Sequence, residues 1–262
     1  MSDDLIDPTP FFGGLYSDLY MPLYRSLRSG PWRLHVIRMV ACRGYWGDVK
    51  PLGGSVVLTR DGPDGGRESW MSLTPTEIES QEIGLRAARG HTVVFGLGMG
   101  WLAANAALRS EVSRVTVVER DGDVIAAVRA AGVLELLPEP ARAKLTLVQA
   151  DALTWRPDAP VDSLQADIWL RYSAPQRIDE ARRMQANVAA TEIYCWGQEI
   201  DIWRYACRRA GHDRPALDWP LLRTIVAEDI RLPLILPDWP DYPARITAAA
   251  QWWTPKEPGW WQ

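Results

Sequence analysis

The sequence has few cysteines, few histidines and no long apolar segment. The three cysteines (Cys42, Cys195 and Cys207) lack the C-x-x-C spacing of metal or redox sites. Their odd number, in a chain without a recognisable signal peptide, favours reduced thiols in the cytoplasm. The three histidines show no metal-ligand spacing either, so we predict no metal site. No apolar run reaches the roughly 20 residues that a membrane-spanning helix needs, so we expect no membrane contact.

A strong excess of one charge is also missing. The chain has 29 basic and 33 acidic residues, and only three of the basic residues are lysine. A nearly neutral, slightly acidic protein has no overall field that would attract nucleic acid or an anionic membrane. We therefore expect a small molecule, rather than a nucleic acid, as the partner.

Tryptophan, by contrast, is abundant. There are 14 tryptophans in 262 residues, and five of them follow Trp219, including the pairs Trp252-Trp253 and Trp260-Trp261. Each indole buries a large apolar area, so this tail must pack onto something. We favour packing on its own domain. A homodimer interface and a role in stacking on the substrate are the alternatives.

The central motif is a short apolar run that breaks into three glycines. The segment from Thr92 to Phe95 predicts a buried strand, and the segment from Trp101 to Leu108 predicts a helix. Between them, Gly96, Gly98 and Gly100 allow the backbone to turn sharply and a ligand to come close. A dinucleotide fold of the G-x-G-x-x-G type would have glycine at Trp101, so a pyrophosphate cradle, and with it NAD, is disfavoured.

Strands and helices alternate after this motif, which predicts a parallel α/β sheet. The second strand ends at Glu119, about two dozen residues after the first glycine, where a ribose-binding carboxylate is expected. A third strand ends just before Asp151. The predicted strands after the first are Arg114 to Glu119, Leu145 to Ala150, Ala166 to Leu170 and Glu192 to Trp196, and the predicted helices are Asp123 to Ala131, Pro175 to Ala186 and Trp196 to Ala210.

The chain before the glycine motif has a different character. Residues 1–72 contain β-type runs with a turn-forming segment at 61–66, which predicts a small β-rich module. A helix should then begin after Thr74, with Pro75 at its first position and Glu77 three residues after the cap, and end before Gly90. We predict a β-rich module over 1–72, a cofactor-binding domain over 73–210 and a Pro/Trp-rich extension over 211–262 packed on the core.

The three alternating glycines are similar to the first motif of class I S-adenosylmethionine-dependent methyltransferases. The segment from Val117 to Val124, together with Asp151, most resembles the spermidine-synthase-like branch of that superfamily, which also lacks an acid at the position of Val94. The resemblance covers roughly residues 55–206. It implies a Rossmann-like, doubly wound, mainly parallel sheet that binds S-adenosyl-L-methionine, behind an N-terminal module that covers part of the active site and contributes to dimers.

The resemblance also implies which residues bind the cofactor. A carboxylate at Asp151 would accept the adenine amino group, and Glu119 would bind the ribose. The expected cofactor-binding residues are Gly96, Leu97, Gly98, Met99, Gly100, Glu119, Arg120, Asp151 and Ala152.

One position departs from the spermidine-synthase-like pattern. Aminopropyltransferases have an aspartate just after the fourth strand, where this chain has Arg171, Tyr172 and Ser173. Asp167 falls at the start of the predicted fourth strand, at the opposite edge from the ligand, so polyamine synthesis is not favoured. Tyr172 and Glu79 remain weak catalytic candidates. Glu79 or Gln81 could contact the ligand, or the acids of that helix could simply complement its dipole.

The pattern as a whole favours a methyltransferase that uses S-adenosylmethionine on a small molecule. Transfer from a sulfonium needs alignment and desolvation, and it needs a base only for a protonated nucleophile. The alternatives are a catalytically degenerate cofactor-binding protein of the same fold, an aminopropyltransferase, and NAD-dependent redox chemistry.

Overall fold

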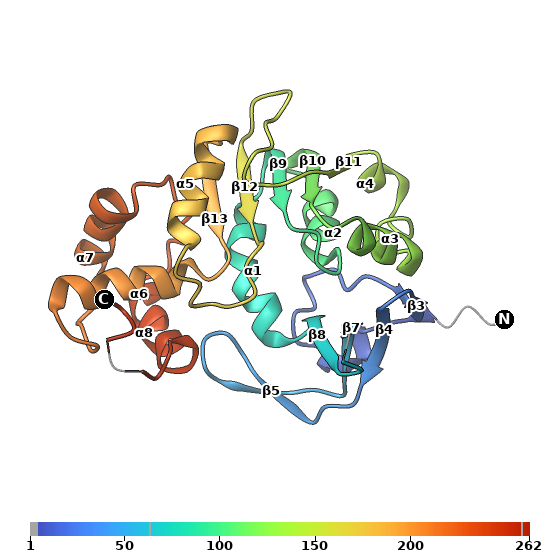
Figure 1. Ribbon diagram of the computed structural model, residues 1–262, viewed down its shortest axis with the longest axis horizontal. Helices are drawn as coiled ribbons and strands as arrows, with labels where there is room; N and C mark the ends of the chain where they lie inside the picture. The colour runs from blue at the N-terminus through green and yellow to red at the C-terminus, as the bar shows by residue number, and fades with distance from the viewer. Residues whose placement is uncertain (1–4, 63, 258) are drawn as a thin grey trace.

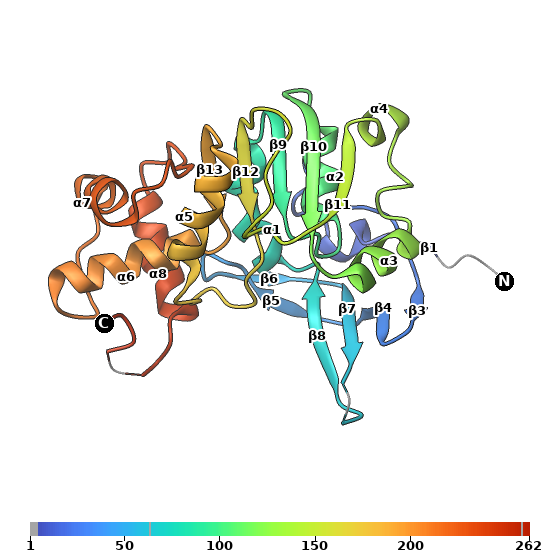
Figure 2. The ribbon, with the colours of Figure 1, turned by 45° about the horizontal axis from the view of Figure 1, so that its top comes forward.

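A parallel five-stranded sheet forms the centre of the molecule (Figures 1 and 2). The computed structural model describes residues 5–62, 64–257 and 259–262. The strands lie in the order β11-β10-β9-β12-β13, and every neighbouring pair is parallel. Their bounds are β9 (Gly90–Phe95), β10 (Val112–Glu119), β11 (Leu145–Gln149), β12 (Ser163–Ala166) and β13 (Glu192–Cys195).

Helices cover both faces of this sheet, as the sequence predicts for a doubly wound fold. The chain runs outward from β9 to β11 in one direction and then returns to the other side of β9 for β12 and β13. Right-handed crossovers therefore place the intervening helices on opposite faces. The helices are α1 (Pro75–Ala87), α2 (Trp101–Leu108), α3 (Gly122–Ala131), α4 (Glu139–Arg142), α5 (Arg177–Val188) and α6 (Gln198–Ala210). In the described residues, no helix combines the length and the apolar character needed to cross a bilayer.

Alternating side chains on β9 feed two separate cores. Val94 packs with α2, α3 and the N-terminal module, whereas Val93 and Phe95 pack with α5, α6 and the C-terminal segment. This alternation is the period of two that a strand buried on both faces requires. The reversal of strand order lies between β9 and β12, and ligands of open α/β sheets gather at the carboxyl ends of strands at such a point.

The N-terminal module is rich in β-structure, as predicted. A four-stranded antiparallel sheet has the order β3-β4-β7-β8, and a β5-β6 ribbon and a β1-β2 pair accompany it. The predicted hairpin joins β7 and β8, with Pro63 of its turn, like residues 1–4 of the module, outside the described residues. The strands are β1 (Leu5–Ile6), β2 (Tyr24–Arg25), β3 (Leu27–Ser29), β4 (Trp32–Ile37), β5 (Ala41–Arg43), β6 (Val49–Pro51), β7 (Ser55–Asp61) and β8 (Arg67–Ser72), with a short 3-10 helix, η1 (Thr9–Phe12).

The helix that follows the module begins where the sequence places it but is capped differently. Thr74 has the extended backbone of an N-cap, yet its side chain makes no capping hydrogen bond. Glu77 does not complete a capping box, because its carboxylate accepts a hydrogen bond from Gln81 instead. The helix ends at Ala87, and Gly90 opens strand β9 rather than closing the helix.

The C-terminal segment packs on the rest of the chain. It forms α7 (Trp219–Thr224), a π-helix η2 (Ile225–Ile230) and α8 (Tyr242–Trp253). An isolated parallel bridge pairs Leu234 with Ile193 of β13. Trp253 donates to the Tyr45 carbonyl oxygen at 2.7 Å, and Trp260 and Trp261 join the core around α6. The tail is thus docked on its own domain.

Candidate functional site

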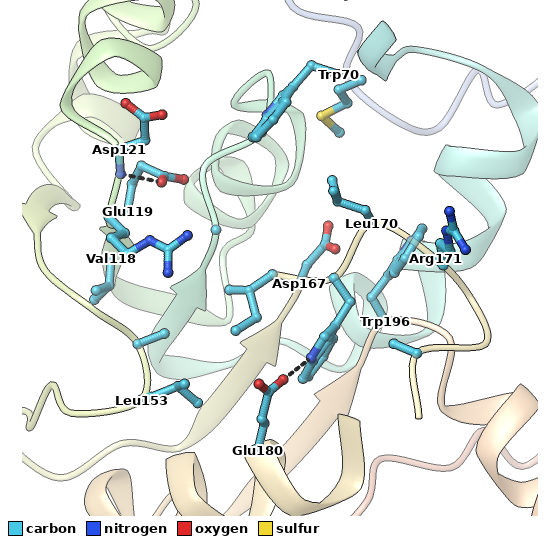
Figure 3. Close-up of a pocket in the computed structure, with 18 of the residues that line it drawn as sticks. Trp70, Val118, Glu119, Asp121, Leu153, Asp167, Leu170, Arg171, Glu180 and Trp196 are labelled. Carbon is cyan, nitrogen blue, oxygen red and sulfur yellow. Dashed lines mark hydrogen bonds between the residues drawn. The ribbon is translucent and has the colours of Figure 1, made fainter. Parts of the chain in front are cut away.

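A cavity of about 800 Å³ lies at the carboxyl ends of all five parallel strands (Figure 3). The loops after β9, β10, β11 and β12 line it, Trp196 closes it after β13, and β8 and α1 contribute from outside the sheet. The glycine loop, Glu119 and Asp151, which are far apart in the sequence, meet in this one cavity.

The glycine loop turns through backbone conformations that only glycine adopts readily. Gly96 has a φ of 89°, and a Cβ atom there would come within 2.0 Å of the Asp167 carbonyl oxygen. A Cβ atom at Gly98 would lie 2.5 Å from the Met71 sulfur. The sequence explains these glycines by the approach of a ligand, but in the structure the close neighbours are the chain's own atoms. The glycines let β9, the loop after β12 and strand β8 approach one another.

The sequence predicts that five residues of this loop bind the cofactor, and the structure places only two of them in the cavity lining. Gly96 and Gly98 line the cavity. The side chains of Leu97 and Met99 are buried, and Gly100 is the left-handed N-cap of α2. These three residues do not line the cavity in the described part of the chain. The backbone N–H groups of Leu97 and Met99 are already used, by Glu119 at 3.0 Å and by the sulfur of Met71 at 3.0 Å respectively.

Glu119 connects two of the loops that line the cavity. It is the last residue of β10, and its carboxylate accepts hydrogen bonds from the Leu97 N–H at 3.0 Å and from the Asp121 N–H at 2.7 Å. Figure 3 shows the second of these bonds. Each carboxylate oxygen can accept more than one hydrogen bond, so the group retains capacity for a ligand hydroxyl. Arg120, also predicted, lines the cavity with an exposed side chain.

Asp151 and Ala152 lie on the neighbouring loop. Both line the cavity, directly after β11, and Asp151 accepts a hydrogen bond from the Leu153 N–H at 2.8 Å. Because β10 and β11 are adjacent and parallel, Glu119 and Asp151 emerge from the same edge of the sheet. The two acids therefore border the same cavity, at the ends of neighbouring strands.

The fourth strand was predicted incorrectly. β12 covers Ser163–Ala166, so the predicted strand 166–170 overlaps it only at Ala166, and residues 167–170 belong to the loop that follows. Asp167 comes directly after the strand and lines the cavity, rather than lying at the opposite edge of the sheet. The apolar run that suggested a strand forms the cavity mouth instead, with Leu170 70% exposed and Ile168 37% exposed. Trp169 is buried, and its indole N–H donates to Glu180 at 2.6 Å.

Asp167 faces a second carboxylate, Glu77, which comes from α1. The side-chain amide nitrogen of Gln81 donates to both, at 2.5 Å to Glu77 and 2.9 Å to Asp167. Burial raises the pKa of both carboxyls, and the charge of Asp167 raises the pKa of Glu77 further. Arg177 opposes the shift of the Asp167 pKa. The raised pKa values of both carboxyls favour their protonated forms at a higher pH than usual.

The two catalytic candidates chosen from the sequence lie elsewhere. Tyr172 stands behind the cavity wall, with its ring 4.2 Å from that of Trp196 and its hydroxyl 3.2 Å from the Ser80 hydroxyl oxygen. Glu79 is 5% exposed and accepts a hydrogen bond from the Tyr16 hydroxyl at 2.6 Å. Glu79 lines a different cavity, of about 550 Å³, on the other side of α1. The helical period explains this, because Glu77 and Gln81 share one face of α1 and Glu79 does not.

A buried ion cluster holds the loop after β12 in place. Arg177 is fully buried and donates to the Asp201 carboxylate at 2.7 Å and to the backbone oxygens of Arg171 and Tyr172 at 2.8 Å. Arg204 binds the other oxygen of Asp201 at 2.9 Å. The cluster thus ties the backbone of Arg171 and Tyr172 to a fully buried guanidinium group.

The cavity has an acidic lining. Six carboxylates and two guanidinium groups border it: Glu77, Glu119, Asp121, Asp151, Asp167 and Glu180 against Arg120 and Arg171. Three indole side chains, of Trp70, Trp169 and Trp196, border it as well. A cationic ligand is favoured in such a site and an anionic one is disfavoured.

The sequence did not single out several of these lining residues. Trp70 belongs to β8 of the N-terminal module, where its ring meets Trp32 at a centroid distance of 5.3 Å. Only the docking of that module on the sheet brings it to the cavity. Asp167 enters the site because β12 pairs with β9 only as far as Ala166, which the sequence does not show.

Comparison with known proteins yields only partial structural matches. No family model matches the sequence, and no curated protein matches it. Solved structures with similar parts include the glycopeptide N-methyltransferase MtfA with S-adenosyl-L-homocysteine (TM-score 0.34, 24% identity, 42% of this chain and 41% of that one). Others are the methyltransferase domain of bacterial CtHen1 (0.33, 15%, 42% and 59%) and a DhpI-SAM-HEP complex (0.33, 20%, 45% and 53%). The chain matches less than two thirds of the length of each of these proteins.

Proposed function

We propose that this protein binds S-adenosylmethionine in the 800 Å³ cavity and transfers its methyl group to a small-molecule acceptor. The observation that carries the proposal is the position of Glu119. Its carboxylate is hydrogen-bonded to the glycine loop at the point where strand order reverses, beside Asp151. In this assignment, Glu119 would bind the ribose hydroxyls and Asp151 the adenine amino group.

The residues present suit this cofactor better than a phosphate-bearing one. Cavities that hold ligands of this size measure roughly 300–1,000 Å³. Phosphate-binding glycine loops offer free N–H groups, but here those of Leu97 and Met99 are taken by Glu119 and Met71. A pyrophosphate would also face the acidic lining. A sulfonium with an ammonium group is favoured by the same carboxylates.

When bound, S-adenosylmethionine supplies an electrophilic methyl group, whose bond to sulfur breaks as the acceptor atom forms its new bond. The protein's part is to orient the two reactants and to exclude water. Trp70 and Met71 of β8 border the glycine-loop end of the cavity, and Trp196 borders the end near Asp167. These apolar groups shield the space between them.

Calorimetric titration of the purified protein tests the proposal. The titrants are S-adenosylmethionine, S-adenosylhomocysteine, decarboxylated S-adenosylmethionine and NAD. We expect binding of the first two and no binding of NAD. A protein that binds NAD and ignores the sulfonium compounds would refute the assignment. A methyl-release screen over amines, phenols and carboxylates then separates an enzyme from a catalytically degenerate binding protein.

Aminopropyl transfer is the second candidate, and the position of Asp167 favours it. The aspartate that aminopropyltransferases have after the fourth strand is matched by Asp167, directly after β12. Only Arg120 and Arg171 in the lining could pair with the carboxylate of S-adenosylmethionine, and both are exposed. Tighter binding of decarboxylated S-adenosylmethionine in the same titration would select this activity over methyl transfer.

A further inference from the structure

The outer edge of strand β8 borders the cavity. Four consecutive residues of this strand, from Ser69 to Ser72, belong to the cavity lining. Successive side chains of a strand point to opposite faces of its sheet, so neither face alone could supply all four. The edge of β8 therefore faces the cavity, and its backbone is part of the lining.

This edge carries no further strand in the described part of the chain. β8 is the last strand in the order β3-β4-β7-β8, and it pairs only with β7. Directly after β8, the Leu73 N–H donates to the Val56 carbonyl oxygen of β7 at 2.9 Å. Backbone groups alternate in direction along an antiparallel strand, so the N–H and C=O of Ser72 point away from β7, to the free edge. Among the described residues, no backbone hydrogen bond from outside the β7–β8 pair reaches these two groups.

Contacts with the glycine loop and with the N-terminal module hold the free edge in position. The Met99 N–H donates to the Met71 sulfur at 3.0 Å, and the missing side chain of Gly98 leaves the space that this sulfur occupies. The pairing register shifts at Trp70, which has no partner on β7, and its ring packs edge-on against Trp32. Irregularities of this kind re-aim side chains beside functional sites. The free edge is thus fixed next to the loop that borders the cofactor end of the cavity.

An extended peptide has the chemistry that a free strand edge accepts. The edge offers N–H and C=O groups in alternation, and another extended amide chain is the ligand that satisfies both. Residues 67–69, at the hairpin end of β8, are exposed, and the β7–β8 hairpin projects from the molecule in Figure 2. A peptide can therefore enter from solvent along this edge and reach the cavity at its far end.

We propose that the free edge of β8 binds a short peptide as an added strand and presents one of its side chains to the cavity. This inference rests on the proposed function, for which it names the acceptor class. Transfer breaks the bond between sulfur and methyl, forms a bond between methyl and a side-chain nitrogen, oxygen or sulfur atom, and releases the proton of that atom to solvent. A second copy of the chain, paired through its own β8, is the alternative occupant. The continuity of the edge with the cavity favours the peptide.

Backbone N-methylation of a peptide tests whether one of its edges is used. The probes are acetyl-Thr-Val-Gln-Val-Thr-amide and two versions of it, one N-methylated at the odd-numbered residues and one at the even-numbered residues. Alternate N–H groups lie on opposite edges of a strand, so each version blocks one edge. In calorimetric titration of protein saturated with S-adenosylhomocysteine, we expect the unmodified peptide and one methylated version to bind. The other version should bind about tenfold or more weakly, because it loses at least two hydrogen bonds.

A variant of the strand tests the same contact from the side of the protein. Ser72→Pro removes the N–H that points to the free edge, and proline is tolerated in edge strands. It should weaken binding of the unmodified peptide about three- to tenfold, while S-adenosylhomocysteine still binds. Arg28→Pro is the matched control, because Arg28 lies on β3, the strand at the other end of the same sheet, and peptide binding should not change.

Four results would overturn the inference. They are no binding of the unmodified peptide, equal binding of the two methylated versions, unchanged peptide binding in Ser72→Pro, and a dimer in light scattering that Ser72→Pro dissociates. The comparison of the two methylated versions needs no variant, so it decides the matter even where Ser72→Pro does not fold. The dimer would assign the free edge to a second copy of the chain.

Incubation with S-adenosylmethionine tests the acceptor class. The peptides carry lysine, histidine, serine, cysteine, tyrosine or glutamine at the centre, and mass spectrometry should detect one added methyl group on at least one of them. Binding without methylation of any peptide would overturn the acceptor class. Failure of the protein to bind S-adenosylhomocysteine would instead refute the proposed function, and titration of the same peptides into the ligand-free protein would still test the free edge.

Discussion

Replacement of Glu119 by alanine removes the group that joins the glycine loop to the end of β10. Two backbone N–H groups, of Leu97 and Asp121, lose their acceptor. The site is partly open, so water replaces some of the lost bonding, and we expect a stability loss of about 1–3 kcal/mol for two hydrogen bonds. If the carboxylate also binds the ribose, binding of S-adenosylhomocysteine weakens by a further ~1.5–3 kcal/mol, which is roughly 10- to 150-fold.

Two measurements distinguish these effects. Urea unfolding gives the stability loss, and calorimetric titration with S-adenosylhomocysteine gives the binding loss. Glu135→Ala, which removes an exposed acid at a distance from the cavity lining, is the control and should change neither. A Glu119→Ala protein that is destabilised but binds with unchanged affinity would show that this carboxylate only orders the loops, and the assignment of the ribose site would fail.

Three further predictions follow from the site. Gly96→Ala should lower the free energy of unfolding in urea by roughly 2–4 kcal/mol, because its Cβ atom would meet the Asp167 carbonyl oxygen. Gly211→Ala is the control, at a similar positive φ with nothing within 4 Å, and should lower it by about 1–2 kcal/mol. Equal losses in the two variants would contradict the packing argument. The pKa values of Glu77, about 8, and Asp167, about 7, are raised in the folded protein, so this pair stabilises the fold at low pH and loses that contribution as pH rises from about 4 to about 8. The stability of Glu77→Gln should therefore rise by about 1–2 kcal/mol relative to that of the unsubstituted protein between pH 5 and pH 8 in thermal unfolding. A constant difference across that range would refute the raised pKa values. Arg177→Met should lower the free energy of unfolding by about 3–5 kcal/mol, because Asp201 and the loop carbonyls lose their donor. Backbone hydrogen exchange in residues 171–176 should become faster for the same reason. Exchange that stays slow would show that other contacts hold the loop.

Local patterns accounted for much of the fold. The β-branched runs before Gly96 and Glu119 became β9 and β10, and the alternation of strands and helices produced the parallel sheet. These predictions succeed because buried parallel strands are apolar on both faces, which leaves a plain signature along the chain. The same reasoning placed Glu119 and Asp151 at one edge, since carboxyl ends of parallel strands coincide.

The fourth strand shows where such reasoning fails. Ile168, Trp169 and Leu170 have the composition of a strand, but pairing with β9 ends at Phe95 and Ala166, directly before Gly96 turns the chain with a φ of 89°. Composition cannot distinguish an apolar strand from an apolar loop at a cavity, because the same residue types occur in both. Because β12 ends a few residues earlier than predicted, Asp167 lies at the carboxyl edge of the sheet and lines the cavity, rather than lying at the opposite edge.

Sequence alone determined the order of elements, the glycine turn and the acids at the ends of β10 and β11, because each depends on neighbours along the chain. Tertiary packing alone decided that Glu77 rather than Glu79 faces the cavity, that Gln81 joins Glu77 to Asp167, and that Trp70 borders the cavity from a separate module. These relations depend on how α1 and β8 are rotated and docked against the sheet. Such rotations are set by contacts between residues distant in sequence, which no local pattern records.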